Sequence, residues 1–263
     1  MYIDAHAHYD DEAFDEDREE LLARVHDAGC DLIINAAQDI ATTVKILEMA
    51  ERIPYLYGTA GIHPHNAKCV SSRRIEELER LACNKNCVAI GEIGLDYHYD
   101  FAPRETQQIV FREQLRLAGT LGLPVVVHDR EAHEDTLTIL DEALSPKSKC
   151  LIHCYSGSRE MAEIIMKRGY YVSIGGAVTF KNARRILEAL DVIPLNRMLL
   201  ETDCPYMTPV PYRGKRNDSS FIPFTAQKIC EVKGVLLDSF YKITSQNAVL
   251  FYNLSRNLEN IWE

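Results

Sequence analysis

Two histidines stand one residue apart near the start of the chain, in the segment Ile3-Asp4-Ala5-His6-Ala7-His8. Side chains at alternate positions of a β-strand share one face, so His6 and His8 are expected to point the same way. Two neighbouring imidazoles can bind a divalent metal ion. The pattern therefore predicts a metal-binding pair, or more simply two polar residues at a strand end.

Further residues of metal-binding type come at or just beyond the ends of short apolar runs: Glu92, His128, His153, Glu201 and Asp203. Enzymes built on parallel barrels collect their site residues at the C-terminal ends of several strands. One apolar run that ends in His or Glu means little. Repetition of this ending along one chain predicts a shared site.

Six of these side chains form a larger ligand set than one catalytic ion needs: His6, His8, Glu92, His128, His153 and Asp203. A catalytic ion usually takes three protein ligands and keeps one position open. A carboxylate can bridge two ions, and paired ions are common in phosphatases and nucleases. The set therefore predicts two divalent ions, and its imidazole and carboxylate groups suit Zn²⁺, Mn²⁺ or Mg²⁺.

The elements that must position these residues follow a repeated strand-then-helix pattern. Eight strands are expected, at Tyr2–Ala7, Asp31–Ala36, Leu56–Gly61, Val88–Ile93, Pro124–His128, Cys150–Cys154, Tyr170–Ile174 and Met198–Thr202. Amphipathic helices are expected at Asp17–Ala28, Thr43–Arg52, Arg104–Leu121, Arg159–Arg168 and Ala183–Leu190. This alternation implies a parallel sheet. Eight units in 263 residues fit an α/β protein of the (β/α)₈ TIM-barrel class, with a doubly wound open sheet as the alternative.

Composition restricts the class of protein further. Apolar residues make up 46% and charged residues 26% of the chain, which excludes a disordered chain or a coiled-coil rod. No linker divides the sequence, so residues 1–263 are expected to form a single domain. No run of 18 apolar residues predicts a membrane span, and the first residues lack a signal-peptide pattern. The eight cysteines form no C-x-x-C pair, so we expect reduced thiols in a cytoplasmic protein.

Seven segments carry a resemblance to a known family: DAHAHYD at Asp4–Asp10, GIHPH at Gly61–His65, GEIGLDYH at Gly91–His98, PVVVHDREA at Pro124–Ala132, HCYSGS at His153–Ser158, LLETDCPYMTP at Leu199–Pro209 and RGKRN at Arg213–Asn217. Together they resemble the TatD family of metal-dependent deoxyribonucleases, within the amidohydrolase-like barrel superfamily. The resemblance covers essentially the whole chain, with the motifs in order.

The resemblance implies a role for each motif residue. The ligands of one ion would be His6, His8, Glu92 and Asp203, and those of the second would be Glu92, His128 and His153. Glu92 would thus bridge the two ions. His63, in GIHPH, matches the family's histidine on the substrate side, and Asp203 would orient or deprotonate the attacking water. The catalytic residues implied are therefore Asp203, Glu92 and His63.

Two further acids share strand faces with these ligands. Glu201 has the strand parity of Asp203, and Asp96 has that of Glu92. A buried carboxylate without a partner is costly, so hydrogen bonds that orient the ligands are the better interpretation of both. Tyr97 and Tyr99 lie beside Asp96 and are read as rim residues, although aromatic faces can stack nucleobases.

Basic side chains gather in the segment that follows the last expected strand. Arg213, Lys215 and Arg216 place three positive charges within five residues, and Arg130 shares the parity of His128. A charge run is usually a solvated surface. In a chain with a net charge of −10, which disfavours non-specific binding to nucleic acid or membranes, a local basic segment near a metal site favours phosphate binding.

The sequence therefore predicts a two-metal phosphodiesterase that acts on DNA, at 3′ ends or on single strands. The first alternative is an amidohydrolase or lactonase with a small-molecule substrate. Many of these enzymes use a carboxylated Lys where this chain has Glu92, which argues against that alternative. The second alternative is a metal-stabilised scaffold without catalytic activity.

Overall fold

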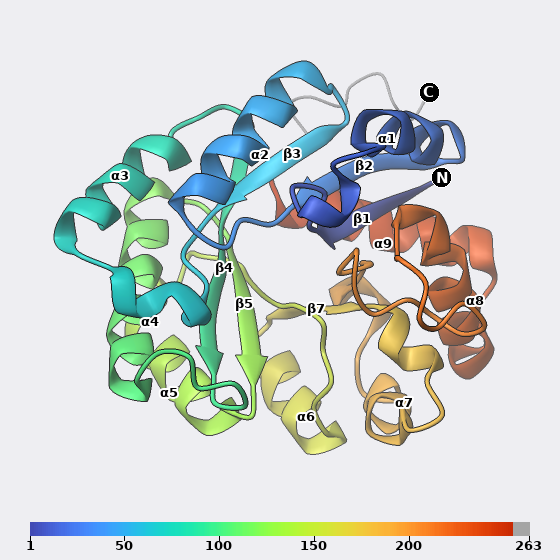
Figure 1. The fold of residues 1–263 in the computed structure, drawn as a ribbon. Coiled ribbons are helices and arrows are strands. Elements are labelled where there is room, and N and C mark those ends of the chain that lie inside the picture. Colours follow the sequence, from blue (N-terminus) through green and yellow to red (C-terminus); the bar gives the residue numbers. More distant parts are fainter. Residues whose placement is uncertain (255–263) are drawn as a thin grey trace. The chain divides into compact units, whose positions relative to one another are not determined.

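The computed structural model describes residues 1–254, and this part of the chain contains eight parallel strands in sequence order (Figure 1). They are β1 (Tyr2–Ala7), β2 (Cys30–Asn35), β3 (Leu56–Ala60), β4 (Cys87–Asp96), β5 (Val125–Arg130), β6 (Cys150–Ile152), β7 (Tyr171–Ile174) and β8 (Met198–Leu200). Each predicted strand is found. β4 extends further than expected, to Asp96, whereas β8 ends at Leu200, before the predicted Thr202.

The α-helices of the described residues are α1 (Arg18–Asp27), α2 (Ile40–Arg52), α3 (Ser72–Ala82), α4 (Arg104–Leu121), α5 (His133–Ala143), α6 (Arg159–Lys167), α7 (Arg184–Leu190), α8 (Ile222–Lys233) and α9 (Leu237–Phe251). The sequence analysis did not predict α3, α8 and α9. α3 is mostly charged, and α9 contains aromatic and β-branched residues that have low intrinsic helix propensity. Whether such segments form helices depends more on tertiary packing than on intrinsic helix propensity.

The chain divides into two compact units, and the first contains Met1–Asn35 and the chain from Cys154 onward. In this unit β1 pairs with β2 and β7 pairs with β8, in both cases in parallel. Helix α9 packs against β1 and β8. Every residue of β1 is buried, so its alternating apolar and polar side chains both lie inside the protein.

The second unit contains Ala36–His153. In this unit β3 pairs with β4, β4 with β5 and β5 with β6, all in parallel, and helix α4 packs against β4 (Figure 1). The Val125–Val127 segment of β5 is fully buried, as expected for a parallel strand covered on both faces. Asp39 caps the start of α2 by accepting a hydrogen bond from the Thr42 backbone, and Gly122 ends α4 in the left-handed conformation.

The sequence also predicts the absence of a membrane-spanning helix and the presence of reduced cysteines. Within the described residues no helix combines the length and the apolar character needed to cross a bilayer. The thiols of Cys30, Cys83, Cys87, Cys150, Cys204 and Cys230 form no disulfide bond, as expected, and the Cys69 side chain lies outside the described residues.

Candidate metal centre

Backbone hydrogen bonds in the first unit bring the ends of β1 and β8 together. The Asp203 N–H donates to the His6 carbonyl at 3.0 Å, and the His8 N–H donates to the Cys204 carbonyl at 2.9 Å. Asp203 has a positive φ of 57°, a conformation that Asp tolerates better than most residues. This local geometry directs the Asp203 carboxylate towards the two histidines.

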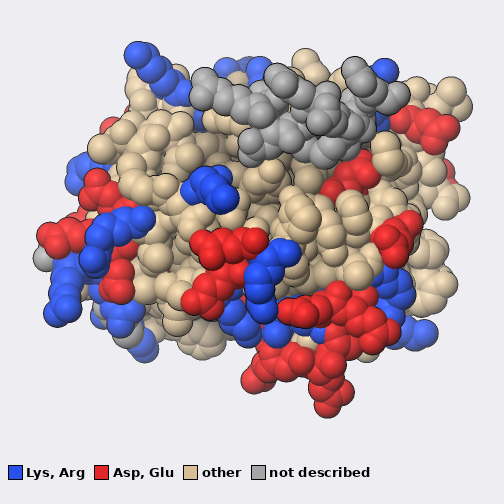
Figure 2. Space-filling model, turned by 90° about the horizontal axis from the view of Figure 1, so that it is seen from above, with Lys and Arg blue, Asp and Glu red and all other residues tan. Residues whose placement is uncertain are grey.

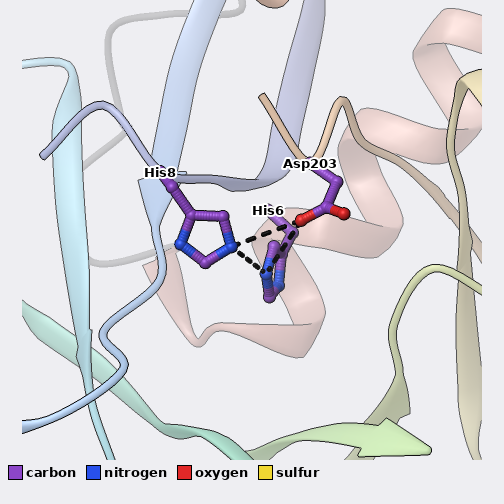
Figure 3. A group of neighbouring side chains, drawn as sticks. All are labelled: His6, His8 and Asp203. Atoms are coloured by element: carbon purple, nitrogen blue, oxygen red, sulfur yellow. Dashed lines mark hydrogen bonds and ion pairs between the residues drawn. The ribbon is translucent and has the colours of Figure 1, made fainter. Parts of the chain in front are cut away.

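Three ligand atoms converge at this point, and we call His6, His8 and Asp203 the His6 group (Figure 3). The His6 Nε2 and His8 Nε2 atoms are 3.2 Å apart, and His8 Nε2 lies 3.3 Å from Asp203 Oδ1. His6 Nε2 lies 3.9 Å from the same oxygen. Ligands of a tetrahedral ion with bonds of roughly 2.0–2.1 Å lie about 3.3 Å apart, so the group fits one such ion with a position left for another ligand.

Asp4 holds the backbone on which this group is built. Its Oδ1 accepts hydrogen bonds from the backbone N–H groups of His6, at 3.3 Å, and Thr202, at 3.0 Å. Its Oδ2 accepts from the hydroxyls of Thr202, at 2.6 Å, and Ser219, at 2.7 Å. Burial raises the pKa of Asp4 to about 6, although these hydrogen bonds partly offset the effect. One buried carboxyl group thus joins β1 to the segment after β8.

Glu92 lies in the middle of β4, where the strand passes unusually close to β5. Gly94 has a φ of +139°, and a Cβ atom at this position would lie 2.0 Å from the His128 carbonyl oxygen. Only glycine permits that approach. The register Gly94↔His128 places the two strands so that the Glu92 carboxylate meets the His128 ring.

Three imidazoles surround one oxygen of this carboxylate, and we call His63, Glu92, His128 and His153 the Glu92 group. Glu92 Oε1 lies 2.7 Å from His153 Nε2, 2.8 Å from His128 Nδ1 and 3.4 Å from His63 Nε2. Burial alone would raise the pKa of Glu92, but the imidazoles outweigh it and hold that pKa well below its usual range. An ionised carboxylate among several imidazoles is a donor set that suits a divalent cation.

The histidines of the Glu92 group differ in protonation. His63 is buried, which lowers its pKa to about 4, and its Nδ1 accepts the His65 backbone N–H at 3.2 Å. Its Nε2 therefore carries the proton and faces Glu92. Burial also disfavours charge on His128, but hydrogen bonds to Asp96 and Glu92 outweigh burial and raise its pKa to about 9. A cation bound by His128 must displace a proton.

Asp96, at the end of β4, orients the histidine ligand opposite it. Its Oδ2 accepts from His128 Nε2 at 3.1 Å and from His65 Nε2 at 2.9 Å. Oriented carboxylate–histidine pairs of this kind fix the ring that faces a metal. Asp96 therefore lies within hydrogen-bond distance of His128, and its bond to His65 was not expected.

Glu201 and the basic residues also have defined surroundings. Glu201 is buried, accepts a hydrogen bond from the Ser173 hydroxyl, and places a carboxylate oxygen within 4.8 Å of a His6 ring nitrogen.

Two of the predicted phosphate contacts lie over aromatic rings. The Arg130 guanidinium carbon lies 4.9 Å from the Tyr99 ring centroid, and that of Arg213 lies 3.7 Å from the Phe180 ring centroid.

The last two predicted phosphate contacts differ from each other. The exposed Lys215 places its ammonium nitrogen 5.3 Å from the Tyr212 ring centroid. Arg216 instead pairs with Asp17, through hydrogen bonds of 2.8 and 2.6 Å, and also donates to the Ala13 carbonyl. Arg216 therefore fastens its loop to the segment before α1.

Two features near these groups escaped the sequence analysis. The hydrogen bond of His65 to Asp96 was not predicted, although the place of His65 beside His63 in GIHPH was a usable signal. The amide of Gln114, in α4, binds both the backbone N–H and the carbonyl of Ile62, at 2.7 and 3.0 Å, and so holds the backbone just before His63. No local pattern pairs residues that lie 52 positions apart.

Comparison with known proteins identifies the class of protein. The family model described as TatD related DNase matches residues 3–253. The chain therefore belongs to the TatD family and is a metal-dependent hydrolase.

Individual relatives agree with this assignment. The chain is 38% identical to the uncharacterized metal-dependent hydrolase YabD of Bacillus subtilis, over 97% of this chain and 100% of that protein. It is 36% identical to the 3′-5′ ssDNA/RNA exonuclease TatD of Cronobacter sakazakii, over 84% of this chain and 86% of that protein. The crystal structure of YJJV, a TatD homologue of Escherichia coli K12, is 31% identical and gives a TM-score of 0.90. That match covers 96% of this chain and 98% of the other, and it confirms the predicted (β/α)₈ barrel class.

Proposed function

We propose that this hydrolase cleaves phosphodiester bonds of DNA with two divalent metal ions. The observation that carries the proposal is that the described residues contain the His6 group and the Glu92 group, in which three imidazoles surround one carboxylate oxygen. Together they offer more ligands than one open catalytic ion requires. Two divalent ions contribute a charge of +4 and the carboxylates of Glu92 and Asp203 contribute −2. The resulting positive charge favours a phosphodiester and an attacking hydroxide.

The residues of each group have separable tasks in this proposal. One ion would be held by His6, His8 and Asp203, and the second by His128 and His153, with Glu92 able to serve both. The bound ions would lower the pKa of water and neutralise charge on the phosphoryl oxygens. Asp203 accepts the proton of the attacking water. His63 is the proposed histidine on the substrate side: its Nδ1 accepts the His65 N–H, so its Nε2–H, which faces Glu92 in this structure, is the group that would turn to the substrate.

The proposed substrate is anionic, so the protein must attract it locally. Figure 2 shows both acidic and basic side chains on one face of the molecule, with acidic side chains grouped along one part of its edge. We assign phosphate contacts to individual basic side chains that follow the candidate ligands in the sequence. Arg130, Arg213 and Lys215 are the proposed direct contacts, and Arg216 contributes by holding the loop.

The proposed polarity and strand preference follow from the relatives. TatD of Cronobacter sakazakii is named as a 3′-5′ ssDNA/RNA exonuclease. We accordingly propose 3′ ends of single strands as the preferred DNA substrate and the cytoplasm as the location. We also propose that residues 1–263 act as a single domain, as expected from the absence of a linker in the sequence.

The decisive experiment separates nucleic acid from small-molecule substrates. Metal-free protein is incubated with single-stranded DNA, double-stranded DNA and a lactone, each with Mg²⁺, Mn²⁺ and Zn²⁺ added in turn. Metal-dependent shortening of the single strand from its 3′ end is expected. Activity should fall at least about 100-fold in His8→Ala and in His153→Ala, one variant from each group, because a metal ligand is lost. His26→Ala, on α1, is the matched control and should retain activity.

Two results would contradict the proposal in different ways. Turnover of the lactone without turnover of DNA would reassign the substrate to the amidohydrolase class. The number of ions is tested by electron paramagnetic resonance of the Mn²⁺-loaded protein. Two ions that share Glu92 should show spin coupling, and this coupling should disappear in His153→Ala. Uncoupled Mn²⁺ signals in the wild-type protein would rule out the shared carboxylate.

A further inference from the structure

Two large aromatic side chains lie exposed on the segment between β4 and α4. Tyr99 is 48% exposed and Phe101 is 55% exposed, and their rings stack at a centroid distance of 5.4 Å with an interplanar angle of 22°. We call this pair the aromatic platform. About half of each side chain remains exposed in the fold, so the pair marks a candidate contact surface.

Hydrogen bonds hold the platform in a fixed position. Asp96 Oδ1 accepts the backbone N–H groups of His98 and Tyr99, at 3.0 and 2.9 Å. The Gln107 side-chain amide donates to the carbonyls of Asp96, at 3.1 Å, and Ala102, at 2.8 Å. The backbone is thus anchored before Tyr99 and after Phe101, which favours ligand binding because little conformational entropy is lost.

The same carboxylate connects the platform with the Glu92 group. While Oδ1 of Asp96 fixes the platform, its Oδ2 binds His128 and His65. The His65 ring lies edge-on to both aromatic rings, with centroid distances of 5.4 Å to Tyr99 and 4.8 Å to Phe101. A ligand on the platform would therefore lie next to His65, which shares the Asp96 carboxylate with the proposed metal ligand His128.

Arg130 lies beside the platform, and its positive charge indicates which class of ligand the platform can bind. The Arg130 guanidinium carbon lies 4.9 Å from the Tyr99 ring centroid. A planar aromatic surface next to a cation suits a ligand that has a flat ring and a nearby negative charge. By contrast, the Tyr97 hydroxyl donates a hydrogen bond to Asp135, and the Arg104 guanidinium lies over the Tyr97 ring. Tyr97 thus contacts other residues of the protein, and we do not include it in the platform.

We propose that Phe101 and Tyr99 stack an unpaired nucleobase next to the phosphodiester that is cleaved, with Arg130 facing the adjoining phosphate. This inference rests on the proposed function, since it takes nucleic acid as the ligand. A base in a duplex has its faces covered by its neighbours, whereas a base in a single strand can leave the stack and meet a protein ring. The platform therefore selects single-stranded nucleic acid with little regard to base identity.

The test is a double-mutant cycle of binding affinities, in which one change is made in the protein and the other in the DNA. Fluorescence anisotropy measures binding of a labelled single-stranded oligonucleotide in the presence of a chelator, so that no hydrolysis occurs. An abasic residue replaces each of the three 3′-terminal nucleotides in turn. At one position the wild-type protein should lose between about 5-fold and 100-fold in affinity, the range expected for one base–aromatic stack. Phe101→Ala should lose as much with the intact DNA and nothing further with that abasic DNA.

Control variants separate stacking from general effects. Phe101→Trp should restore affinity because it keeps an aromatic face, and Phe101→Leu should not, although it keeps an apolar side chain. Ile109→Ala removes a similarly exposed apolar side chain, 51% exposed on α4, and should bind like the wild type. Unchanged unfolding midpoints in urea would show that the variants remain folded.

The outcomes distinguish this inference from the proposed function. If Phe101→Ala binds the intact oligonucleotide as wild type does, or if its loss adds to the abasic loss at all three positions, the platform does not stack a base. Absence of measurable binding by the wild-type protein also overturns the inference. If the cycle gives the expected result but metal-loaded protein leaves DNA intact, the stacking site stands and the proposed hydrolysis fails.

Discussion

Glu201 is a buried acid beside the His6 group, and its role can be tested by measuring metal affinity at that group. Its carboxylate accepts the Ser173 hydroxyl and approaches a His6 ring nitrogen. We predict that Glu201→Gln keeps the fold, because the amide has nearly the same shape. The lost charge should weaken binding of the ion at His6 by about 10–100-fold, as is typical when a supporting partner of a ligand is removed. Calorimetric titration of metal-free protein with Zn²⁺ measures this affinity.

The matched control for this prediction is Glu188→Gln. Glu188 is an exposed acid that pairs with Arg184 on α7, so its loss should leave Zn²⁺ affinity unchanged. Equal affinities in Glu201→Gln and wild-type protein would show that Glu201 serves packing and not the ligands.

At the scale of residues, the sequence is informative wherever the signal is local. His128 and Glu92 stand out because each interrupts or ends an apolar run that reads as a buried strand. The bond between His65 and Asp96 joins residues 31 positions apart, and the pair of Arg216 and Asp17 spans 199 positions. Such partners depend on how the chain folds back, which spacing along the sequence does not record.

The close approach of β4 and β5 depends on a single glycine. Alanine at Gly94 would need a strained backbone, and its Cβ would also meet the His128 carbonyl. We predict that Gly94→Ala costs clearly more stability than Gly122→Ala. At Gly122, φ is +69° but no atom lies within 4 Å of an added Cβ, so only the left-handed backbone is strained, at about 1–2 kcal/mol.

Urea unfolding of the two glycine variants measures this difference. A similar loss of unfolding free energy in both variants would mean that β4 moves away from β5 at little cost. In that case the Glu92 carboxylate would not depend on glycine for its position.

The loop after β8 contains two neighbouring basic residues with different tasks. Lys215 is exposed, whereas Arg216 is paired with Asp17. We predict that Lys215→Ala makes the salt dependence of single-stranded DNA binding shallower by about 0.7 in the slope of log K against log salt, the value for one lost phosphate contact. Arg216→Ala should change this slope less, since its charge is already neutralised by an acid of the same chain.

Oligonucleotide binding between low and moderate salt gives the slope for each variant. Lys228→Ala serves as the control, because Lys228 lies on α8 and pairs with Glu231. If Arg216→Ala changes the slope as much as Lys215→Ala, the Arg216–Asp17 pair opens when DNA binds. If neither variant changes the slope, this loop does not hold the phosphate backbone.

For the whole molecule, the alternation of strand and helix predicts the barrel class because parallel neighbours require crossover connections. The periodic signal was sufficient for all eight strands. It was insufficient for α8, which begins with Ile222 and Pro223 directly after a short 3₁₀-helix at Ser219–Phe221. Helices of this kind form because the rest of the protein offers an apolar surface, and that surface exists only after folding.

Metal binding should also stabilise the whole molecule, because the ligands converge only in the folded state. Binding to the native state alone contributes about 2.7 kcal/mol when the free ion is at 100 times its dissociation constant. For a chain of this size that corresponds to roughly 5–10 °C in the unfolding midpoint. We therefore predict that a chelator lowers the midpoint of wild-type protein by about this amount. Differential scanning calorimetry with and without chelator measures the shift.

Variants show whether both ligand groups contribute to this stabilisation. His8→Ala removes a ligand from the His6 group and His153→Ala removes one from the Glu92 group. Each should reduce the shift caused by the chelator, and the double variant should show almost none, because neither ion then binds tightly. The same shift in wild-type and double-variant protein would place the stabilising metal elsewhere. No shift in the wild-type protein would mean that the groups are too weakly occupied to contribute to folding.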